Sequence, residues 1–102
     1  MGITLGGYDF DGPYTSTENL EDRAGVFAAV CLQKRRYFVL DVGQSEAVKS
    51  CVEDHERQAC WRQHCSGKLG VAVHYAPGLH QADRTKIEQQ LRRQYKPPCN
   101  QT

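Results

Sequence analysis

The residues best suited to chemistry in this chain are cysteines and histidines that lie close together in the sequence. Cys51 with His55, and Cys60 with His64, have the four-residue spacing that places two side chains on one face of a helix. Thiolate and imidazole groups are the usual ligands of zinc, which takes four of them in a tetrahedron. The short Cys-x2-Cys spacing of most structural zinc sites is missing from this segment. We therefore expect buried thiols and a hydrogen-bonded histidine here rather than zinc.

Charged residues form two further groups. Lys34-Arg35-Arg36 is a basic run between two apolar segments, and it can contact nucleic acid or simply be solvated. Glu88 has Arg84 four residues before it and Arg92 four residues after it. Helix ion pairing explains this spacing without a metal. Glu88 therefore needs a second reason before a metal-binding role is assigned to it.

The composition restricts the classes of protein to consider. The chain has 102 residues, of which 39% are hydrophobic, and a net charge of +1, which fits one small domain without a strong overall field for nucleic acid. No apolar stretch approaches the roughly 20 residues that cross a membrane, and the first ten residues lack the pattern of a signal peptide. We therefore expect a cytoplasmic protein with no membrane partner. Its five cysteines are then expected to be free thiols or metal ligands rather than disulfides.

A hairpin and a helix must position the first of these residues. Apolar runs at about residues 25–32 and 36–42, joined by the basic run, predict two paired strands. Gly43 then provides a turn and Ser45 an N-cap for a helix. The buried face of that helix is expected to comprise Val48, Cys51, Val52 and His55.

The second half of the chain predicts a third strand and a last helix. Residues 56–65 continue the first helix or form another one, and residues 69–76 alternate as a strand does. Asp83 caps a helix over about 83–95, which Pro97-Pro98 ends. Residues 1–22 are expected to be an irregular lead-in, and residues 23–102 a single domain. The predicted fold is a small α+β sandwich with a three-stranded antiparallel sheet flanked by helices, in the order β-β-α-(α)-β-α.

In element order and marker residues, the chain resembles the GIY-YIG nuclease domain over about residues 25–100. Gly25-Val26-Phe27 matches the first short motif of that family, and Asp41-Val42-Gly43 matches the second. Gly25 and Gly43 stand at the motif glycines, Glu88 at the metal-binding glutamate and Asn100 at the late asparagine. The segment from Gly12 to Arg23 also resembles a small bacterial subgroup of these proteins.

The resemblance implies a hydrolase that cleaves DNA, in which Glu88 holds Mg²⁺ or Mn²⁺ and the metal polarises a phosphodiester. Three expected groups are replaced, however. Phe27 and Asp41 stand where the family has tyrosines, and Cys51 stands where it has a helix arginine. Phe27 and Cys51 can neither position a water nor stabilise charge on phosphorus. Losing a charge-stabilising group typically costs orders of magnitude in rate.

Nearby residues can be named as substitutes. Tyr37 lies four residues before Asp41, on the same face of a regular strand, and can supply a phenol. Asp41 can join Glu88 as a metal ligand, and His55 can act as a general base. Arg57 can add positive charge for DNA binding, in addition to Lys34, Arg35 and Arg36.

We therefore expect a GIY-YIG-like domain that acts on or binds DNA, with weak or lost phosphodiesterase activity. The candidate catalytic residues are Tyr37, Asp41, His55, Glu88 and Asn100. The alternative is a non-catalytic module that binds nucleic acid or protein, in one version stabilised by zinc through Cys51, His55, Cys60 and His64. A chain this short would need a homodimer or an additional protein partner to choose a target site.

Overall fold

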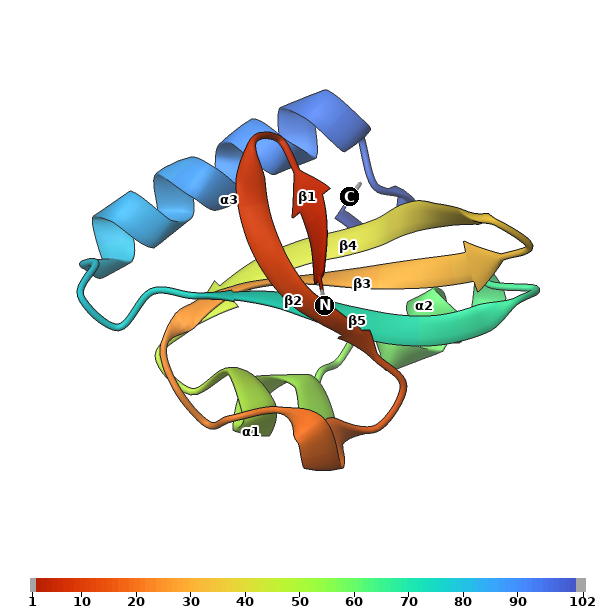
Figure 1. The fold of residues 1–102 in the computed structure, drawn as a ribbon, viewed down its shortest axis with the longest axis horizontal. Helices are drawn as coiled ribbons and strands as arrows, with labels where there is room; N and C mark the ends of the chain where they lie inside the picture. Colours follow the sequence, from red (N-terminus) through yellow and green to blue (C-terminus); the bar gives the residue numbers. More distant parts are fainter. Residues whose placement is uncertain (1, 101–102) are drawn as a thin grey trace.

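Five antiparallel strands form one sheet at the centre of the computed structural model, which describes residues 2–100 (Figure 1). Their order across the sheet is β1-β2-β5-β3-β4, so β4 lies at an edge. The strands are β1 (Gly2–Leu5), β2 (Tyr8–Tyr14), β3 (Gly25–Gln33), β4 (Arg36–Ser45) and β5 (Lys68–Tyr75). The helices are α1 (Val48–Glu53), α2 (Gln58–Gln63) and α3 (Gln81–Tyr95), with single turns η1 (Thr17–Asn19) and η2 (Pro98–Asn100).

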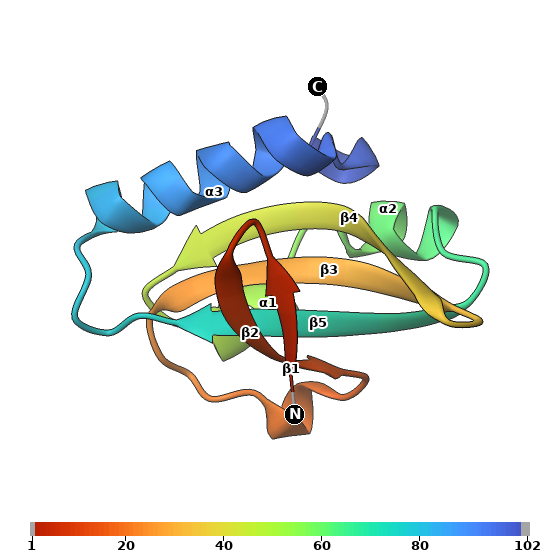
Figure 2. The ribbon, with the colours of Figure 1, turned by 45° about the horizontal axis from the view of Figure 1, so that its top comes forward.

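Helices cover both faces of the sheet, and this explains the long apolar run of β3. One core lies under α3, which runs along β4 (Figure 2), and includes Val26, Ala28, Val30 and Leu91. The other core lies under α1 and α2 and includes Phe27, Ala29, Val52 and Trp61. Since successive strand residues point to opposite faces, every residue of β3 from Gly25 to Cys31 is buried. Full burial of each large apolar side chain stabilises the fold by roughly 1.5–3 kcal/mol.

The N-terminal segment is more regular than the sequence suggests. An irregular lead-in is expected over residues 1–22, but β1 and β2 form a hairpin, and β2 pairs with β5. The sheet therefore has five strands rather than the three expected. The hairpin is hard to recognise because Gly6 and Gly7, both at positive φ, resemble a loop, and only Leu5 and Phe10 are buried in it. From Gly25 onward the elements follow one another as two strands, two helices, a strand and a helix.

Strand β4 continues past Gly43, so this glycine does not form the expected turn. Gly43 lies inside the strand opposite Phe27, and a Cβ there would meet the Phe27 ring at 2.5 Å. The glycine therefore makes room for an aromatic ring. Ser45 ends the strand rather than capping α1. The cap comes from Asp22, whose carboxylate accepts hydrogen bonds from the backbone N–H and the hydroxyl of Ser50 at 3.0 and 2.7 Å, which lowers the pKa of Asp22.

A β-bulge at Leu40 changes which side chains of β4 share a face. Asp41 pairs with Ala29, whereas Val39 pairs with the next residue of β3, so one residue of β4 is unmatched. An additional residue moves the side chains before it to the other face of the sheet. Tyr37 therefore lies on the face opposite Asp41, and the expectation that they share a face is wrong because the strand is not regular.

Four of the five cysteines form disulfides, in contrast to the free thiols or metal ligands expected. Cys31 is bonded to Cys65 and Cys60 to Cys99, while Cys51 is free. Because disulfides persist mainly in oxidising compartments, the cysteines no longer support a cytoplasmic location. Of the helices within residues 2–100, none has both the length and the apolar character of a membrane span.

Candidate functional site

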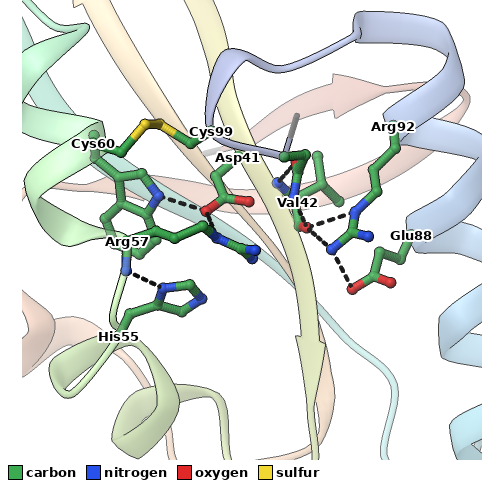
Figure 3. A network of polar contacts seen from close by, with 10 residues as sticks. Asp41, Val42, His55, Arg57, Cys60, Glu88, Arg92 and Cys99 are labelled. Carbon is green, nitrogen blue, oxygen red and sulfur yellow. Dashed lines mark hydrogen bonds and ion pairs between the residues drawn. A yellow bond between two sulfur atoms is a disulfide. The ribbon is translucent and has the colours of Figure 1, made fainter. Parts of the chain in front are cut away.

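Polar side chains from four parts of the chain meet beside the C-terminal half of β4 (Figure 3). We call this group the edge cluster, and its members are Asp41, Arg57, Glu88, Arg92 and Asn100. Asp41 belongs to β4, Arg57 to the turn before α2, Glu88 and Arg92 to α3, and Asn100 to η2. The outward backbone groups of an edge strand have no neighbouring strand. Side chains from both faces of the sheet can therefore reach them here.

Asp41 is fully buried and is held by two N–H donors. Arg57 Nε and Trp61 Nε1 each donate to its Oδ2 at 2.7 Å. Its other oxygen, Oδ1, is also buried and has no hydrogen-bond partner among the described residues. A buried carboxylate left without its partner charge is strongly destabilising. Arg57 and Trp61 therefore fix β4 to the α1–α2 segment through this one oxygen.

The backbone of Val42 is held by side chains instead of by a sixth strand. Asn100 Oδ1 accepts a hydrogen bond from the Val42 N–H at 2.7 Å, and Asn100 Nδ2 donates to the Val42 carbonyl at 3.2 Å. Arg92 donates to the same carbonyl through Nε and Nη2 at 3.3 and 3.2 Å. Asn100 thus has a structural role in which both polar ends of its amide bond the backbone of Val42.

Glu88 is the carboxylate of the edge cluster that still reaches solvent, with 13% of its side chain exposed. Its Oε2 lies 3.5 Å from Nη2 of Arg92, as the spacing in the sequence predicts. Arg84, the other expected partner, instead hydrogen-bonds Gln44 and the carbonyl of Leu79. Burial raises the pKa of Glu88, although the positive charges of Arg92 and Arg57 oppose this shift. The carboxylate is therefore desolvated and lies within the field of both arginines.

His55 lies beside the edge cluster and is packed as a neutral ring. Burial lowers its pKa, and its Nδ1 accepts the backbone N–H of Arg57 at 3.1 Å. The ring lies 4.8 Å from that of Trp61 and 5.6 Å from that of Phe27, measured between centroids. Since Nδ1 is an acceptor, the proton of the neutral ring is on Nε2. The free nitrogen of His55 is therefore a donor, which does not suit the predicted role of general base.

The remaining predicted residues lie apart from the edge cluster. Tyr37 is 41% exposed on the other face of β4. Lys34, Arg35 and Arg36, which we call the basic turn, are exposed where β3 turns into β4. From Arg36 to Val42 the strand extends for roughly 20 Å at the usual rise per residue. Gly25 is buried at the start of β3 and pairs with Ser45 and Tyr75.

The carboxylates of the edge cluster fit Mg²⁺ or Mn²⁺ poorly. Protein sites for Mg²⁺ combine one or two carboxylates with several waters. Here Asp41 already pairs with Arg57, and Glu88 already pairs with Arg92. A divalent cation between them would meet two guanidinium groups. The partly exposed N–H groups of the arginines suit an anion better than a metal ion.

Two residues that hold β4 at this site were not predicted in their observed roles. Trp61 was expected to be a core anchor, but it also supplies a hydrogen bond to Asp41. Arg92 was expected only as an ion-pair partner of Glu88, but it also holds Val42. The bond between Trp61 and Asp41 could have been predicted from the sequence, because a buried indole N–H and a carboxylate within an apolar strand both require hydrogen-bond partners.

Comparison with known proteins identifies no family. A scan against protein-family models and searches of curated proteins and solved structures found no match to this chain. The GIY-YIG assignment therefore stays a prediction from the residues of this chain.

Proposed function

We propose that this chain is a GIY-YIG-like domain that binds the phosphate backbone of DNA and has weak or lost phosphodiesterase activity. The observation that carries the proposal is the edge cluster. Glu88 and Asn100 match two marker residues of that family, and Asp41 stands where the family has a tyrosine. All three lie in the edge cluster beside Asp41 and Val42 of β4. Arg57 adds a guanidinium to this group, whereas Cys51 stands at the sequence position where the resemblance implies a helix arginine.

The surroundings of Glu88 favour binding over cleavage. Phe27 is 1% exposed in the core and has no hydroxyl. Tyr37 lies across the sheet, and His55 presents an N–H rather than a base. Within residues 2–100 we therefore find no phenol or base placed to activate a water beside Glu88. A domain that retains the scaffold without these groups is expected to cleave slowly or not at all.

Two separate basic surfaces are proposed to contact DNA. Arg57 and Arg92 have side chains that are 31% and 36% exposed, so each can donate to a phosphate while it keeps its contact inside the protein. The basic turn lies roughly 20 Å further along β4. Phosphates on one DNA strand are about 3.4 Å apart along the helix axis, so this distance corresponds to about six nucleotides. Both surfaces can therefore engage one short duplex.

The salt dependence of DNA binding tests this proposal. We would measure fluorescence anisotropy of a labelled duplex and a labelled branched DNA over a range of salt concentrations. Replacing the basic turn by Lys34→Asn, Arg35→Gln and Arg36→Gln should reduce the salt slope by up to about 0.9 for each lost phosphate contact. The matched control removes three other exposed cations through Arg62→Gln, Lys86→Gln and Arg93→Gln. Salt-insensitive binding, or equal weakening by both triple variants, would contradict the proposal.

The variant Glu88→Gln separates binding from cleavage. It removes a negative charge near Arg57 and Arg92, so without added metal it should bind DNA at least as tightly as the wild type. Plasmid and branched DNA incubated with Mg²⁺ or Mn²⁺ would show whether the wild type cleaves and whether the variant does not. Rapid metal-dependent cleavage that Glu88→Gln abolishes would show that the catalytic site has survived. Equal slow cleavage by both proteins would remove Glu88 from any catalytic role.

A further inference from the structure

Outside the edge cluster, the side chains of Cys60, His64 and Cys99 form a compact group of potential metal ligands. Their two sulfurs and a ring nitrogen of His64 all lie within 4.8 Å of one another. Cys60 and His64 come from one face of α2 and its C-terminal cap, and Cys99 comes from η2. Cys99 is buried, Cys60 is half-buried and His64 is exposed. The group therefore has an inner side and a side open to solvent.

In the structure Cys60 and Cys99 are joined as a disulfide, and this determines when they can bind a metal. A disulfide sulfur is a poor ligand, whereas two thiolates and one imidazole are typical ligands of zinc. Donor atoms around one tetrahedral zinc lie about 3.5–3.8 Å apart, given Zn–S and Zn–N distances of about 2.3 and 2.0 Å. The ring nitrogen of His64 is already within 4.8 Å of both sulfurs. After reduction, the sulfurs need only separate to this spacing, which is a shift of side chains.

We propose that Cys60, His64 and Cys99 form a redox-gated zinc site. Under oxidising conditions the two cysteines are a disulfide. A dithiol or phosphine reductant supplies two electrons, and two protons are taken up from solvent as the S–S bond breaks to give two thiols. Binding of Zn²⁺ then releases both thiol protons to solvent. The metal is held by two thiolates and His64, with water in the fourth position.

The ligand set differs from the sequence-based zinc alternative. Cys60 and His64 are in both sets, but Cys99 takes the place of Cys51 and His55. His55 is instead packed between Phe27 and Trp61. Cys99 could not be found from spacing, because it lies far along the chain and is brought to α2 only by the fold.

The location of the site gives it a structural effect on β4. Trp61, which follows Cys60, hydrogen-bonds Asp41, and Asn100, which follows Cys99, hydrogen-bonds Val42. The Cys60–Cys99 bond therefore ties together the two elements that hold adjacent residues of β4. Zinc would keep α2 and η2 joined when the disulfide is reduced, so the edge cluster would be retained in both redox states.

The test is a zinc titration of the full chain, oxidised and after reduction with a phosphine, in competition with a chromophoric chelator. The reduced wild type should bind one zinc ion per chain, and the oxidised protein should bind at least 100-fold more weakly. His64→Ala keeps the disulfide in the oxidised protein. In the reduced protein it should weaken zinc binding by more than the 10- to 100-fold that is typical of losing a group that only hydrogen-bonds a metal ligand. Cys99→Ala should weaken binding at least as much, and Co²⁺ in the reduced wild type should give the visible spectrum of a tetrahedral site with two thiolates.

Matched controls distinguish this site from the other thiols and histidines. Cys51→Ala, His55→Ala and the pair Cys31→Ala with Cys65→Ala should leave zinc affinity unchanged. If reduction alone unfolds the chain, zinc must restore the fluorescence of Trp61 in the wild type but not in His64→Ala. Equal affinity in the oxidised and reduced states, or loss of binding in Cys51→Ala but not in Cys99→Ala, would overturn the proposal.

Discussion

The ion pair between Asp41 and Arg57 gives the most direct test of how the edge cluster is built. Asp41 is fully buried, and Arg57 supplies its only charged partner in the described part of the chain, at 2.7 Å. In Arg57→Met the carboxylate keeps Trp61 as a donor but loses its opposite charge. Removing one partner of a buried pair costs about 3–5 kcal/mol. Because Arg57 is 31% exposed, we expect the lower end, about 3 kcal/mol.

A double-mutant cycle separates this charge effect from packing. In the Asp41→Asn background the buried group is neutral, so Arg57→Met should cost only about 1 kcal/mol, as for an ordinary hydrogen bond. The difference predicts a coupling of about 2 kcal/mol between the two residues.

Urea unfolding of the oxidised protein is a suitable assay, since Trp61 is the one tryptophan of the sequence and contacts Asp41 directly. With an m value of about 1.5 kcal/mol/M, a loss of 3 kcal/mol lowers the midpoint by about 2 M. Arg62→Met, on an exposed arginine of α2, is the matched control and should shift the midpoint little. If Arg57→Met costs the same in both backgrounds, or less than about 1 kcal/mol, the buried ion pair does not hold β4 as described.

Three further predictions concern stability. Burial raises the pKa of Glu88 above its usual 4.5, so the folded state of the wild type loses stability as pH rises through that shifted pKa. Glu88→Gln should therefore have the higher free energy of unfolding at pH 7. This advantage should disappear below about pH 4.5, where Glu88 is protonated in both states. Gly43→Ala should cost about 1–3 kcal/mol in urea unfolding, because its methyl group overlaps the Phe27 ring, and Phe27→Leu should recover part of this loss. Replacing both Cys31 and Cys65 by alanine removes a disulfide between residues that are 34 positions apart. The free energy of unfolding should fall by about 3–4 kcal/mol. The thermal midpoint should therefore be lower than that of the oxidised wild type.

Each of these predictions has a clear contrary result. A Glu88→Gln stability difference that does not change with pH would mean that the carboxylate is solvated in the folded state. Gly43→Ala at no cost would show that the Phe27 ring can move away. A disulfide variant as stable as the wild type would show that the unfolded chain is already restricted in the 31–65 segment.

The sequence predicted the elements whose hydrophobic pattern is local and continuous. The β3–β4 hairpin and α3 fall close to their expected ranges, because apolar runs and helical spacing reflect the burial of neighbouring residues. The β1–β2 hairpin was missed because its pairing with β5 is long-range and its glycine turn resembles a loop. The bulge at Leu40 has no local signal, yet it decides on which face Tyr37 lies.

For the candidate site, the sequence identified residues better than partners. Asp41, Glu88 and Asn100 all lie in the edge cluster, but their partners Arg57, Trp61, Arg92 and Val42 are set by the three-dimensional fold. The disulfides were missed for a different reason. The odd number of cysteines favoured free thiols, and the pairing of distant cysteines cannot be deduced from spacing alone.

The bonds that Asn100 makes with Val42 also bear on self-association. A free strand edge can recruit a second chain and begin sheet-to-sheet aggregation. A single asparagine amide here donates and accepts the hydrogen bonds that an incoming strand would otherwise make at this point. The Asn100 side chain therefore blocks the pairing of another strand with β4 at Val42. Asn100→Ala would expose this point of the edge without changing the net charge, so this variant is expected to form fibres more readily than the wild type.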